Sequence, residues 1–272
     1  MKVRILLTFL LMAAFLLNAT AQTTITGRII NEHDEGVEYA TIALCGDSIG
    51  TLADAQGRFS LTIPNYIKSD LSISHVSYDR ALIPHSTYYN GKQLLIKLKD
   101  KNVELSEVVI SKKNKLKTIL GKKMPGPTGS FRGKGQENWI EWGPTFKSKK
   151  DWIVSDILFS IKKCTHERCV LSFSFYEKRG NEWVNILNKP IYKVVNKTSQ
   201  KTKLDVKPGD DIILKAGKEY YISVSVVDSD EYGILEFASQ LRSCIARQLS
   251  KDRTRKIPAG PAITIMGYEL QR

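Results

Sequence analysis

The chain has 272 residues, with 41 Lys and Arg against 28 Asp and Glu, a formal net charge of +13, and a hydrophobic share of 42%. This length is enough for one or two domains that each bury a core. The ordinary hydrophobic share excludes both wholesale disorder and a polytopic membrane protein.

Residues 1–21 have the pattern of a secretory signal peptide. Lys2 and Arg4 precede an apolar run over 5–17, and Ala19 and Ala21 supply small residues at the −3 and −1 positions. This order predicts cleavage between Ala21 and Gln22. The run is shorter than the roughly 20 apolar residues of a spanning helix, although an uncleaved N-terminal anchor is the alternative. We therefore expect an exported chain that is soluble or peripherally attached.

The positive charge is concentrated in one stretch, which marks a domain boundary. Residues 111–150 contain 11 basic and 2 acidic residues, so this stretch carries +9 of the net +13. A Pro- and Gly-rich segment at 125–129 follows the first lysines, and such breakers predict a linker over 111–130. The strip is interpreted either as a solvated tether or as a contact for an anionic envelope polymer or lipid head group. Its lysines are Lys112, Lys113, Lys115, Lys117, Lys122 and Lys123.

Residues 22–110 predict an all-β unit. Apolar and polar residues alternate in short runs, and turn residues separate them, with Gly57 expected at positive φ. Short strands at this spacing are typical of a sandwich. The expected strands are 24–30, 39–44, 59–63, 71–74 and 93–98.

Four blocks of this unit resemble a known family. They are ITGRI at 25–29, GVEYATI at 36–42, GTLADAQGRFSL at 50–61 and LSISHVSY at 71–78. In order and spacing they are similar to the carboxypeptidase regulatory-like domain, a prealbumin-like β-sandwich of exported Bacteroidetes proteins. His75 and Ser77 depart from it, standing where an aromatic residue and Gly are usual. The resemblance implies residence in the periplasm, or on the outer membrane or cell surface, of a Gram-negative bacterium.

The sequence contains no sign of the carboxypeptidase activity that the family's name mentions. A catalytic zinc needs three converging ligands. The four His are His33, His75, His85 and His166, and none belongs to a zinc-protease motif. The resemblance implies a non-catalytic accessory domain, and we expect neither a metal nor another cofactor. The segment at 103–110 is also similar to the one that joins this domain to TonB-dependent outer-membrane receptors.

Residues 131–272 predict a second, jelly-roll-like β-sandwich. It is similar to C-terminal sandwiches that accompany regulatory-like domains. Helical spacing of apolar residues within 234–249 indicates one helix there. The expected strands are 153–161, 171–175, 183–187, 191–195, 220–226 and 263–270.

Cys164 and Cys169 stand at the ends of two expected strands, as in a four-residue hairpin. Facing positions across such a hairpin suit a disulfide, and export permits oxidation. Two free thiols are the competing interpretation, and a metal site with His166 and Glu167 is disfavoured because so short a hairpin does not aim four side chains inward. Cys45 and Cys244 are expected to be free.

Other patterns leave function open. The acidic clusters at 210–211 and 228–231 fit calcium binding, a glycosidase pair, or simple solubility. Trp139, Trp142 and Trp183 are candidate glycan contacts, or else core anchors. No nucleophile elbow or phosphate loop occurs. We expect a non-catalytic envelope protein acting as a binding or adaptor module, without a nucleic-acid partner. A polysaccharide-binding module of a nutrient-uptake system is the alternative, and an envelope hydrolase comes third.

Overall fold

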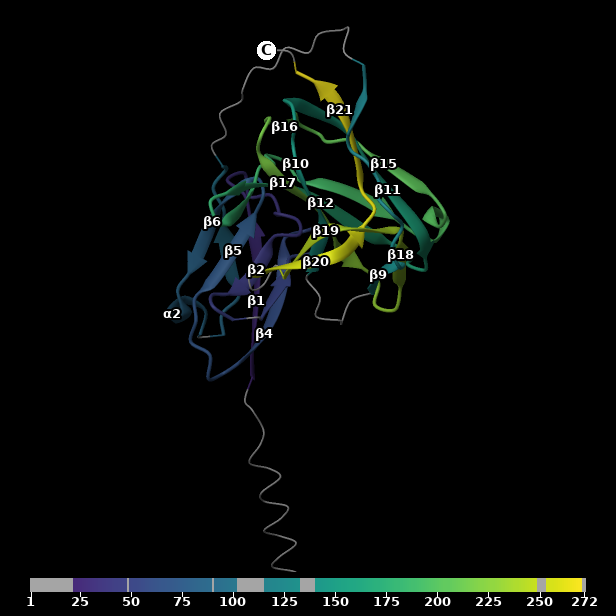
Figure 1. Cartoon of the computed structure of the whole chain (residues 1–272). Coiled ribbons are helices and arrows are strands. Elements are labelled where there is room, and N and C mark those ends of the chain that lie inside the picture. The colour runs from purple at the N-terminus through teal and green to yellow at the C-terminus, as the bar shows by residue number, and fades with distance from the viewer. Residues whose placement is uncertain are drawn as a thin grey trace, which may run out of the picture.

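Strands make up nearly all regular structure in the chain. The computed structural model describes residues 22–47, 49–89, 91–101, 115–132, 140–248 and 253–270. Two β units lie side by side, the first coloured purple to blue and the second teal to yellow in Figure 1. Within the described ranges, helix is limited to α2 (His85–Tyr88) and the 3₁₀ turn η1 (Lys197–Ser199). In that part of the chain no helix is long and apolar enough to cross a membrane.

The N-terminal unit is a sandwich of a three-stranded and a four-stranded sheet, as the sequence predicts. The first sheet has the order β4-β1-β7, in which β1 pairs antiparallel with β4 and parallel with β7. The second has the order β3-β2-β5-β6. The strands are β1 (Gln22–Ile30), β2 (Thr41–Leu44), β3 (Gly50–Leu52), β4 (Arg58–Pro64), β5 (Leu71–His75), β6 (Tyr78–Ile83) and β7 (Leu94–Lys97).

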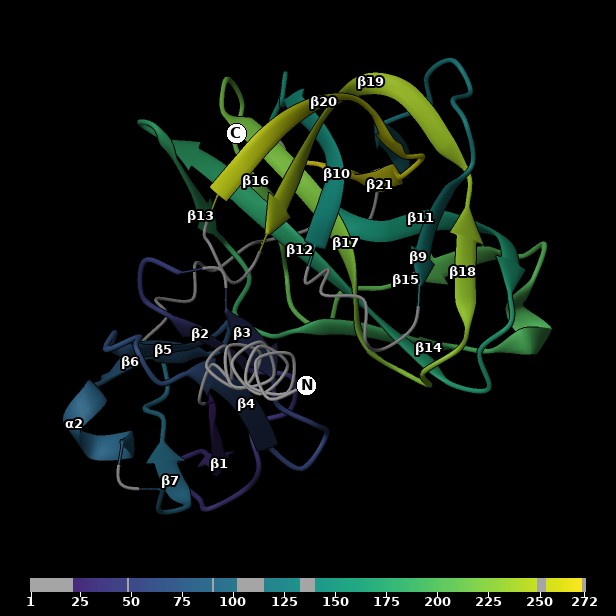
Figure 2. The ribbon, with the colours of Figure 1, turned by 90° about the horizontal axis from the view of Figure 1, so that it is seen from below.

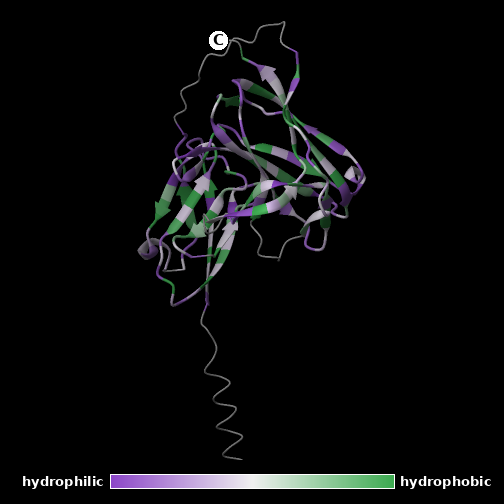
Figure 3. Ribbon diagram, viewed as in Figure 1, coloured by the Kyte–Doolittle hydropathy of each residue, from purple (hydrophilic) through white to green (hydrophobic). Residues whose placement is uncertain are grey.

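Alternation along the strands builds the N-terminal core. In β1 the buried positions are Ile25, Gly27, Ile29 and Ile30, and residues 26 and 28 between them face solvent. Gly27 lies against the Phe59 ring, where a Cβ would come within 2.6 Å. The φ of +77° at Gly57 confirms the expected turn. Hydrophobic positions accordingly alternate with polar ones along these strands in Figure 3.

The second unit is a larger sandwich of two seven-stranded sheets. The first sheet has the order β13-β12-β17-β10-β19-β20, and β14 also pairs with β12. The second has the order β8-β21-β11-β18-β9, and β15 and β16 also pair with β11. The strands are β8 (Lys117–Leu120), β9 (Gly129–Arg132), β10 (Ile140–Lys147), β11 (Trp152–Cys164), β12 (Cys169–Arg179), β13 (Glu182–Asn185), β14 (Ile191–Val195), β15 (Lys203–Val206), β16 (Ile213–Leu214), β17 (Glu219–Ser229), β18 (Ile234–Phe237), β19 (Ser239–Gln248), β20 (Arg253–Pro261) and β21 (Thr264–Glu269).

Strand β17 is buried on both faces, which positions the candidate site. Its Tyr220, Ile222 and Val224 enter the core between the two sheets, as the alternation predicts. Ser223 and Ser225 point the other way, yet they are buried as well. The outer face of this sheet is therefore covered, and the views in Figures 1 and 2 agree in placing the N-terminal unit against it.

The expected helix within 234–249 is wrong. Residues 234–237 form β18 and residues 239–248 form β19, and the two strands belong to different sheets. Ala238 is the corner, and its N–H donates to the carbonyl of Ser160. The apolar spacing of three and four residues arises because two strands with period 2 meet at a break in register.

The expected linker over 111–130 is wrong from residue 117 onward. Residues 117–120 form β8, which pairs with β21, and residues 129–132 form β9, which pairs with β18. The Pro and Gly segment is bound to β19, because Gly126 N–H donates to Ser239 O and Lys123 N–H donates to Gln240 Oε1. These breakers shape a turn of the second unit, so the second unit begins before residue 131. Residues 111–114 lie outside the described residues.

The predicted hairpin between Cys164 and Cys169 is also wrong. Strands β11 and β12 lie in opposite sheets and do not pair, so the intervening residues form a crossover between the sheets. Both cysteines are buried in the core, and all four cysteines of the chain are free thiols. The cross-strand geometry on which the disulfide prediction rested is therefore missing.

Candidate functional site

Two of the three candidate glycan-binding tryptophans can be placed, and they differ. Trp142 packs edge-to-face against Phe131 and Phe237, with ring centroids 5.6 and 5.4 Å apart, so it belongs to the core and not to a glycan platform. Trp183 is half-buried on β13 and lines the pocket described below. Trp139 lies outside the described residues.

The remaining candidate residues do not gather into a site. Asp210 pairs with Lys189 at 2.8 Å, and Asp228 pairs with Arg168. Across the described ranges, no group of three or more His, Cys, Asp or Glu is arranged to hold a metal ion. Lys115, Lys117, Lys122 and Lys123 are exposed, and Lys117 pairs with Glu269 at 2.8 Å. Gln22 is the exposed first residue of β1, whereas Ala21, Lys112 and Lys113 lie outside the described residues.

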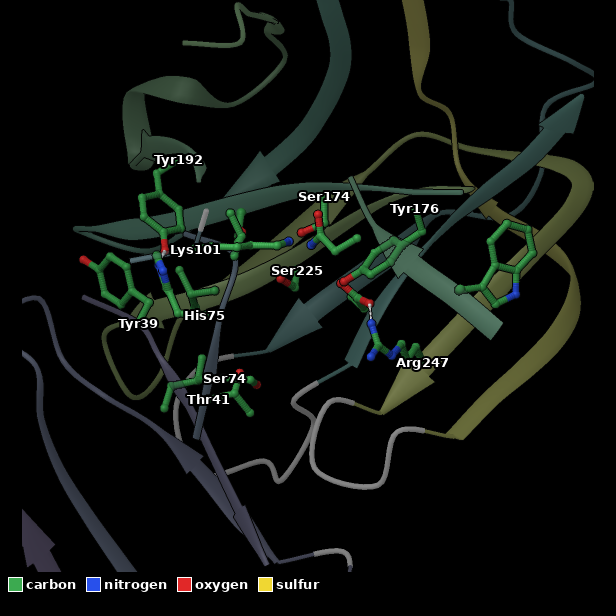
Figure 4. Close-up of a pocket in the computed structure, with 17 residues that line it drawn as sticks. Tyr39, Thr41, Ser74, His75, Lys101, Ser174, Tyr176, Tyr192, Ser225 and Arg247 are labelled. Carbon is green, nitrogen blue, oxygen red and sulfur yellow. Dashed lines mark hydrogen bonds and ion pairs between the residues drawn. The ribbon is translucent and has the colours of Figure 1, made fainter. Parts of the chain in front are cut away.

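A pocket of about 230 Å³ lies where the two sandwiches meet. In Figure 4 residues of the N-terminal unit, among them Tyr39, His75 and Ser74, lie at the left and lower left, and residues of the second unit lie above and to the right. Hydroxyl and amide groups dominate the lining, and aromatic rings stand at both ends. The lining residues include Tyr39, His75, Lys101, Glu141, Ser172, Ser174, Tyr176, Trp183, Asn185, Tyr192, Ser225 and Arg247.

Serines on β12 and β17 form the floor of the pocket, which is lined by Ser172, Ser174 and Ser225. Ser172 stands directly opposite Ser225, and Ser174 stands opposite Ser223. Two successive positions of each strand on this face are therefore serines, while Phe173 and Val224 between them enter the core. The Oγ of Ser225 has no hydrogen-bond partner within the described part of the chain, although the side chain is only 5% exposed. A ligand can complete such hydroxyls.

A buried charge network on the same face closes one end of the pocket. Glu141 on β10 is 2% exposed. It accepts hydrogen bonds from Tyr176 Oη at 3.0 Å and Ser223 Oγ at 2.9 Å, and it pairs with Arg247 at 3.2 Å. The guanidinium also lies 5.0 Å from the centroid of the Tyr176 ring. Burial raises the pKa of the Tyr176 phenol above its ordinary value, so Tyr176 stays protonated and donates.

The opposite end joins the two units. Tyr192 of β14 packs edge-to-face on Tyr39, with ring centroids 5.1 Å apart, and its Oη lies 3.4 Å from Nε2 of His75. Arg168 donates from Nη2 to the Tyr39 hydroxyl at 3.2 Å. Burial lowers the pKa of His75 to about 4, so the imidazole is neutral at pH 7. The contacts fix both units around one shared pocket.

The sequence contains a signal for this pocket, although no motif marks it. Serines alternate with apolar residues at 171–175 and 222–225, where exposed strand faces usually place longer polar or charged side chains. Small uncharged polar residues on two neighbouring strands are typical of a face that another element covers closely. Tyr39 and Tyr192 lie far apart in sequence, and the pattern around them does not single them out. Chemically, the arrangement offers hydrogen-bond donors, acceptors and aromatic faces.

Residues 25–110 match the family model of the CarboxypepD_reg-like domain, which confirms the resemblance of the N-terminal unit. No curated protein matches the chain. Among solved structures, the chain is similar to one of "Structure of infectious bursal disease virus Gt strain", at 10% sequence identity and a TM-score of 0.31. That similarity covers 92% of this chain and 61% of the viral chain, so this chain spans less than two thirds of the viral chain's length.

Proposed function

We propose that this protein is an exported, non-catalytic binding protein of the bacterial cell envelope, and that its ligand site is the pocket between the two sandwiches. The observation that carries the proposal is the serine floor, the hydroxyls of Ser172, Ser174 and Ser225 that line the pocket between the two units. Polar groups buried beside an enclosed space are costly unless they find hydrogen-bond partners, which a ligand can supply.

The N-terminal domain supports the envelope part of this proposal. Carboxypeptidase regulatory-like sandwiches are accessory domains of exported Bacteroidetes proteins. The match at 25–110 includes residues 103–110, the segment that is similar to the one joining this domain to TonB-dependent receptors. On this proposal the protein works in the periplasm or at the cell surface, and it serves an outer-membrane receptor system as an adaptor. The tagged protein should then retain a receptor from solubilised envelope fractions.

Saccharides are the ligand class we favour, since a specific feature of the pocket suits them. Hydroxyl groups line the floor, and the half-buried Trp183 side chain lines the same pocket. Aromatic faces accept the C–H groups of a sugar ring while polar neighbours bind its hydroxyls. Trp183 therefore remains a candidate glycan contact, whereas Trp142 packs in the core.

A pocket-filling variant tests the proposal. Ser225→Ile places a β-branched side chain on the floor, where a strand accommodates it, and fills the space that a ligand needs. We expect the purified protein to bind saccharides in titration calorimetry and this variant to lose binding while its circular dichroism stays unchanged. Ser60→Ile, on the exposed face of β4, is the matched control and should bind normally. Equal binding by both variants would place the ligand elsewhere.

A separate assay tests the proposal that the protein is not an enzyme. We expect no cleavage of peptide or glycan substrates by the purified protein with added divalent metal ions. Chelator-sensitive peptide cleavage would overturn this part of the proposal and leave the pocket as a candidate substrate site.

A further inference from the structure

A surface of basic and apolar side chains forms where the chain between β8 and β9 runs beside the start of β19. The Leu241 N–H donates to the carbonyl of Met124 at 2.8 Å, and Arg242 Nη1 donates to the carbonyl of Gly121 at 3.1 Å. Figure 2 places the start of β19 at the upper right, away from the N-terminal unit at the lower left. We call this surface the basic patch, and its members are Lys122, Lys123, Met124, Leu241 and Arg242.

The basic patch exposes two large apolar side chains. Met124 is 68% exposed and Leu241 is 46% exposed. The register of β19 with β20 shifts between Leu241 and Cys244, and a bulge of this kind turns side chains out of the regular alternation. The fold therefore holds Leu241 outside the core, next to the segment that carries Met124. Exposed apolar groups that adjoin each other and are rimmed by charge are typical of a contact surface.

The charges of the basic patch are all positive. Lys122 and Lys123 are exposed, and the half-buried Arg242 directs its guanidinium to a neutral backbone carbonyl. No carboxylate within the described part of the chain forms an ion pair with any of the three. Burial lowers the pKa of the Arg242 guanidinium, whereas a carboxylate partner would raise it. The structure describes 115–132 and 140–248 without a break, so the sequence neighbours of all three residues are included.

The combination of charge and apolar surface favours a lipid bilayer over a dissolved polyanion. At an anionic bilayer, basic side chains reach the phosphate head groups while apolar side chains enter the boundary between head groups and acyl chains. A soluble anionic polymer would use the positive charges and leave Met124 and Leu241 in water. A bilayer surface accounts for both features.

We propose that the basic patch binds the surface of an anionic lipid bilayer, with its three basic side chains at the phosphate groups and its two apolar side chains in the interfacial layer. This inference goes beyond the proposed ligand site, because none of the five residues lines the pocket. It also narrows the anionic contact that the sequence predicts over 112–123, and it adds Leu241 and Arg242, which lie far from that stretch in sequence.

Vesicle sedimentation tests the proposal with the chain that begins at Gln22. The probes are vesicles of pure phosphatidylcholine and of an equimolar mixture of phosphatidylcholine and phosphatidylglycerol. We expect binding to the mixed vesicles at low ionic strength. Binding to the neutral vesicles should be about a hundredfold weaker, because each of three basic residues contributes about fivefold near an anionic surface. High salt should weaken binding to the mixed vesicles by screening.

Paired substitutions separate the two parts of the basic patch. Replacing both lysines, as Lys122→Gln with Lys123→Gln, should weaken binding to the mixed vesicles about 25-fold. Replacing both apolar residues, as Met124→Gln with Leu241→Gln, should weaken it about tenfold, because less apolar surface then leaves water. Circular dichroism shows that each variant is folded.

Exposed residues of the N-terminal unit provide the matched controls. Lys68→Gln with Lys92→Gln removes the same charge, and Leu82→Gln removes an apolar side chain that is 60% exposed. Both should bind as the unaltered protein does. Unchanged binding by the variant without Lys122 and Lys123 would overturn the proposal, as would equal binding to both kinds of vesicle or binding to neither. If only the charge variant lost binding, the lipid assignment would be wrong and a soluble polyanion would be the partner. None of these results bears on saccharide binding in the pocket.

Discussion

At the scale of single residues, Glu141 shows why the outer face of the β12–β17 sheet needs a partner. A carboxylate at 2% exposure is stable only when its lone pairs are occupied. Tyr176, Ser223 and Arg247 supply the donors from three neighbouring strands. The network therefore joins β12, β17 and β19 to β10, on the face that the N-terminal unit covers.

Replacing Glu141 by Gln keeps the shape of the side chain and removes its charge. Arg247 then loses its carboxylate, and one of the hydroxyl donors loses an ionised acceptor. We expect the free energy of unfolding to fall by about 2–3 kcal/mol, the usual worth of hydrogen bonds to a charged group. Urea unfolding measures the loss. Glu219→Gln is the control, because its pair with Lys178 at 3.3 Å is exposed on both sides and should cost less than about 1 kcal/mol.

His75 predicts a dependence of stability on pH. Its pKa is about 4 in the folded protein and near 6.5 in an unfolded chain. As pH falls from 6.5 to 4, the unfolded chain takes up a proton that the folded protein refuses, so stability is lost across this window. Below pH 4 the loss reaches about 3 kcal/mol. His75→Gln should therefore lose less stability between pH 7 and pH 4.5 than the unaltered protein.

The measurement is the slope of the free energy of unfolding against pH, compared between His75→Gln and the unaltered protein. The carboxylates titrate alike in both proteins, so their contribution cancels in this comparison. His33→Gln, in an exposed turn, should retain the slope of the unaltered protein. Equal slopes for all three proteins would show that His75 is solvated and does not seal the pocket against Tyr192.

The thiols provide a further prediction at this scale. Cys164, Cys169 and Cys244 are buried, and burial raises the pKa of each thiol, to about 12 for Cys244. Thiolate is the reactive form, so we expect only Cys45 to react quickly with a thiol reagent in the native protein. Four thiols should react in denaturant without reductant. Two reactive thiols in denaturant would instead establish one disulfide, and peptide mapping would show whether it joins Cys164 and Cys169.

At the scale of elements, the pairing of β10 with β17 requires their backbones to approach closely at Gly143. A Cβ at Gly143 would come within 1.9 Å of the carbonyl oxygen of Ile222. Gly143→Ala must therefore push the two strands apart, and we expect a loss of about 2–3 kcal/mol, as for other overpacked sites. Thermal unfolding measures it as a lower Tm. Gly209→Ala is the control, since no atom lies within 4 Å of its Cβ position, and its Tm should stay within about 2 °C.

Elements such as these also show what the sequence can and cannot predict. Strands β12 and β17 follow from strict alternation of apolar and polar residues, and β14 is predicted with its observed bounds. Strands β8 and β9 were missed because they lie in or beside the Lys-, Pro- and Gly-rich stretch at 111–130, and β20 because Arg, Lys, Pro and Gly make up most of it. Pairing with distant strands overrides such a composition. The pocket depends on side chains from both units, so its assembly cannot be inferred from local patterns.

At the scale of the whole molecule, the two sandwiches are joined by a small set of side chains. Tyr192 packs on Tyr39 and meets His75, Arg168 donates to Tyr39, and Val76 of the N-terminal unit packs against the core cluster of the second unit. These contacts lie beside the pocket. Docking of the units and completion of the site are therefore the same event.

Tyr192→Ala tests this coupling. The change removes an aromatic pair worth about 0.5–1.5 kcal/mol beyond area burial, and this loss falls on the contact between the units. All four Trp lie in the second half of the chain, so Trp fluorescence follows the second sandwich while circular dichroism follows both. We expect the N-terminal unit to melt about 4 °C lower or more, because a domain of this size shifts by about 4–8 °C per kcal/mol.

The two signals should then separate, with circular dichroism showing an earlier transition and Trp fluorescence changing little. Tyr232→Ala, in a turn where the side chain is 92% exposed, should leave both signals unchanged. If Tyr192→Ala instead shifted both signals by the same amount, Tyr192 would stabilise the second sandwich itself. The pocket would then have to form without help from this contact, and its dependence on docking would rest on other contacts, such as those of Arg168 and Val76.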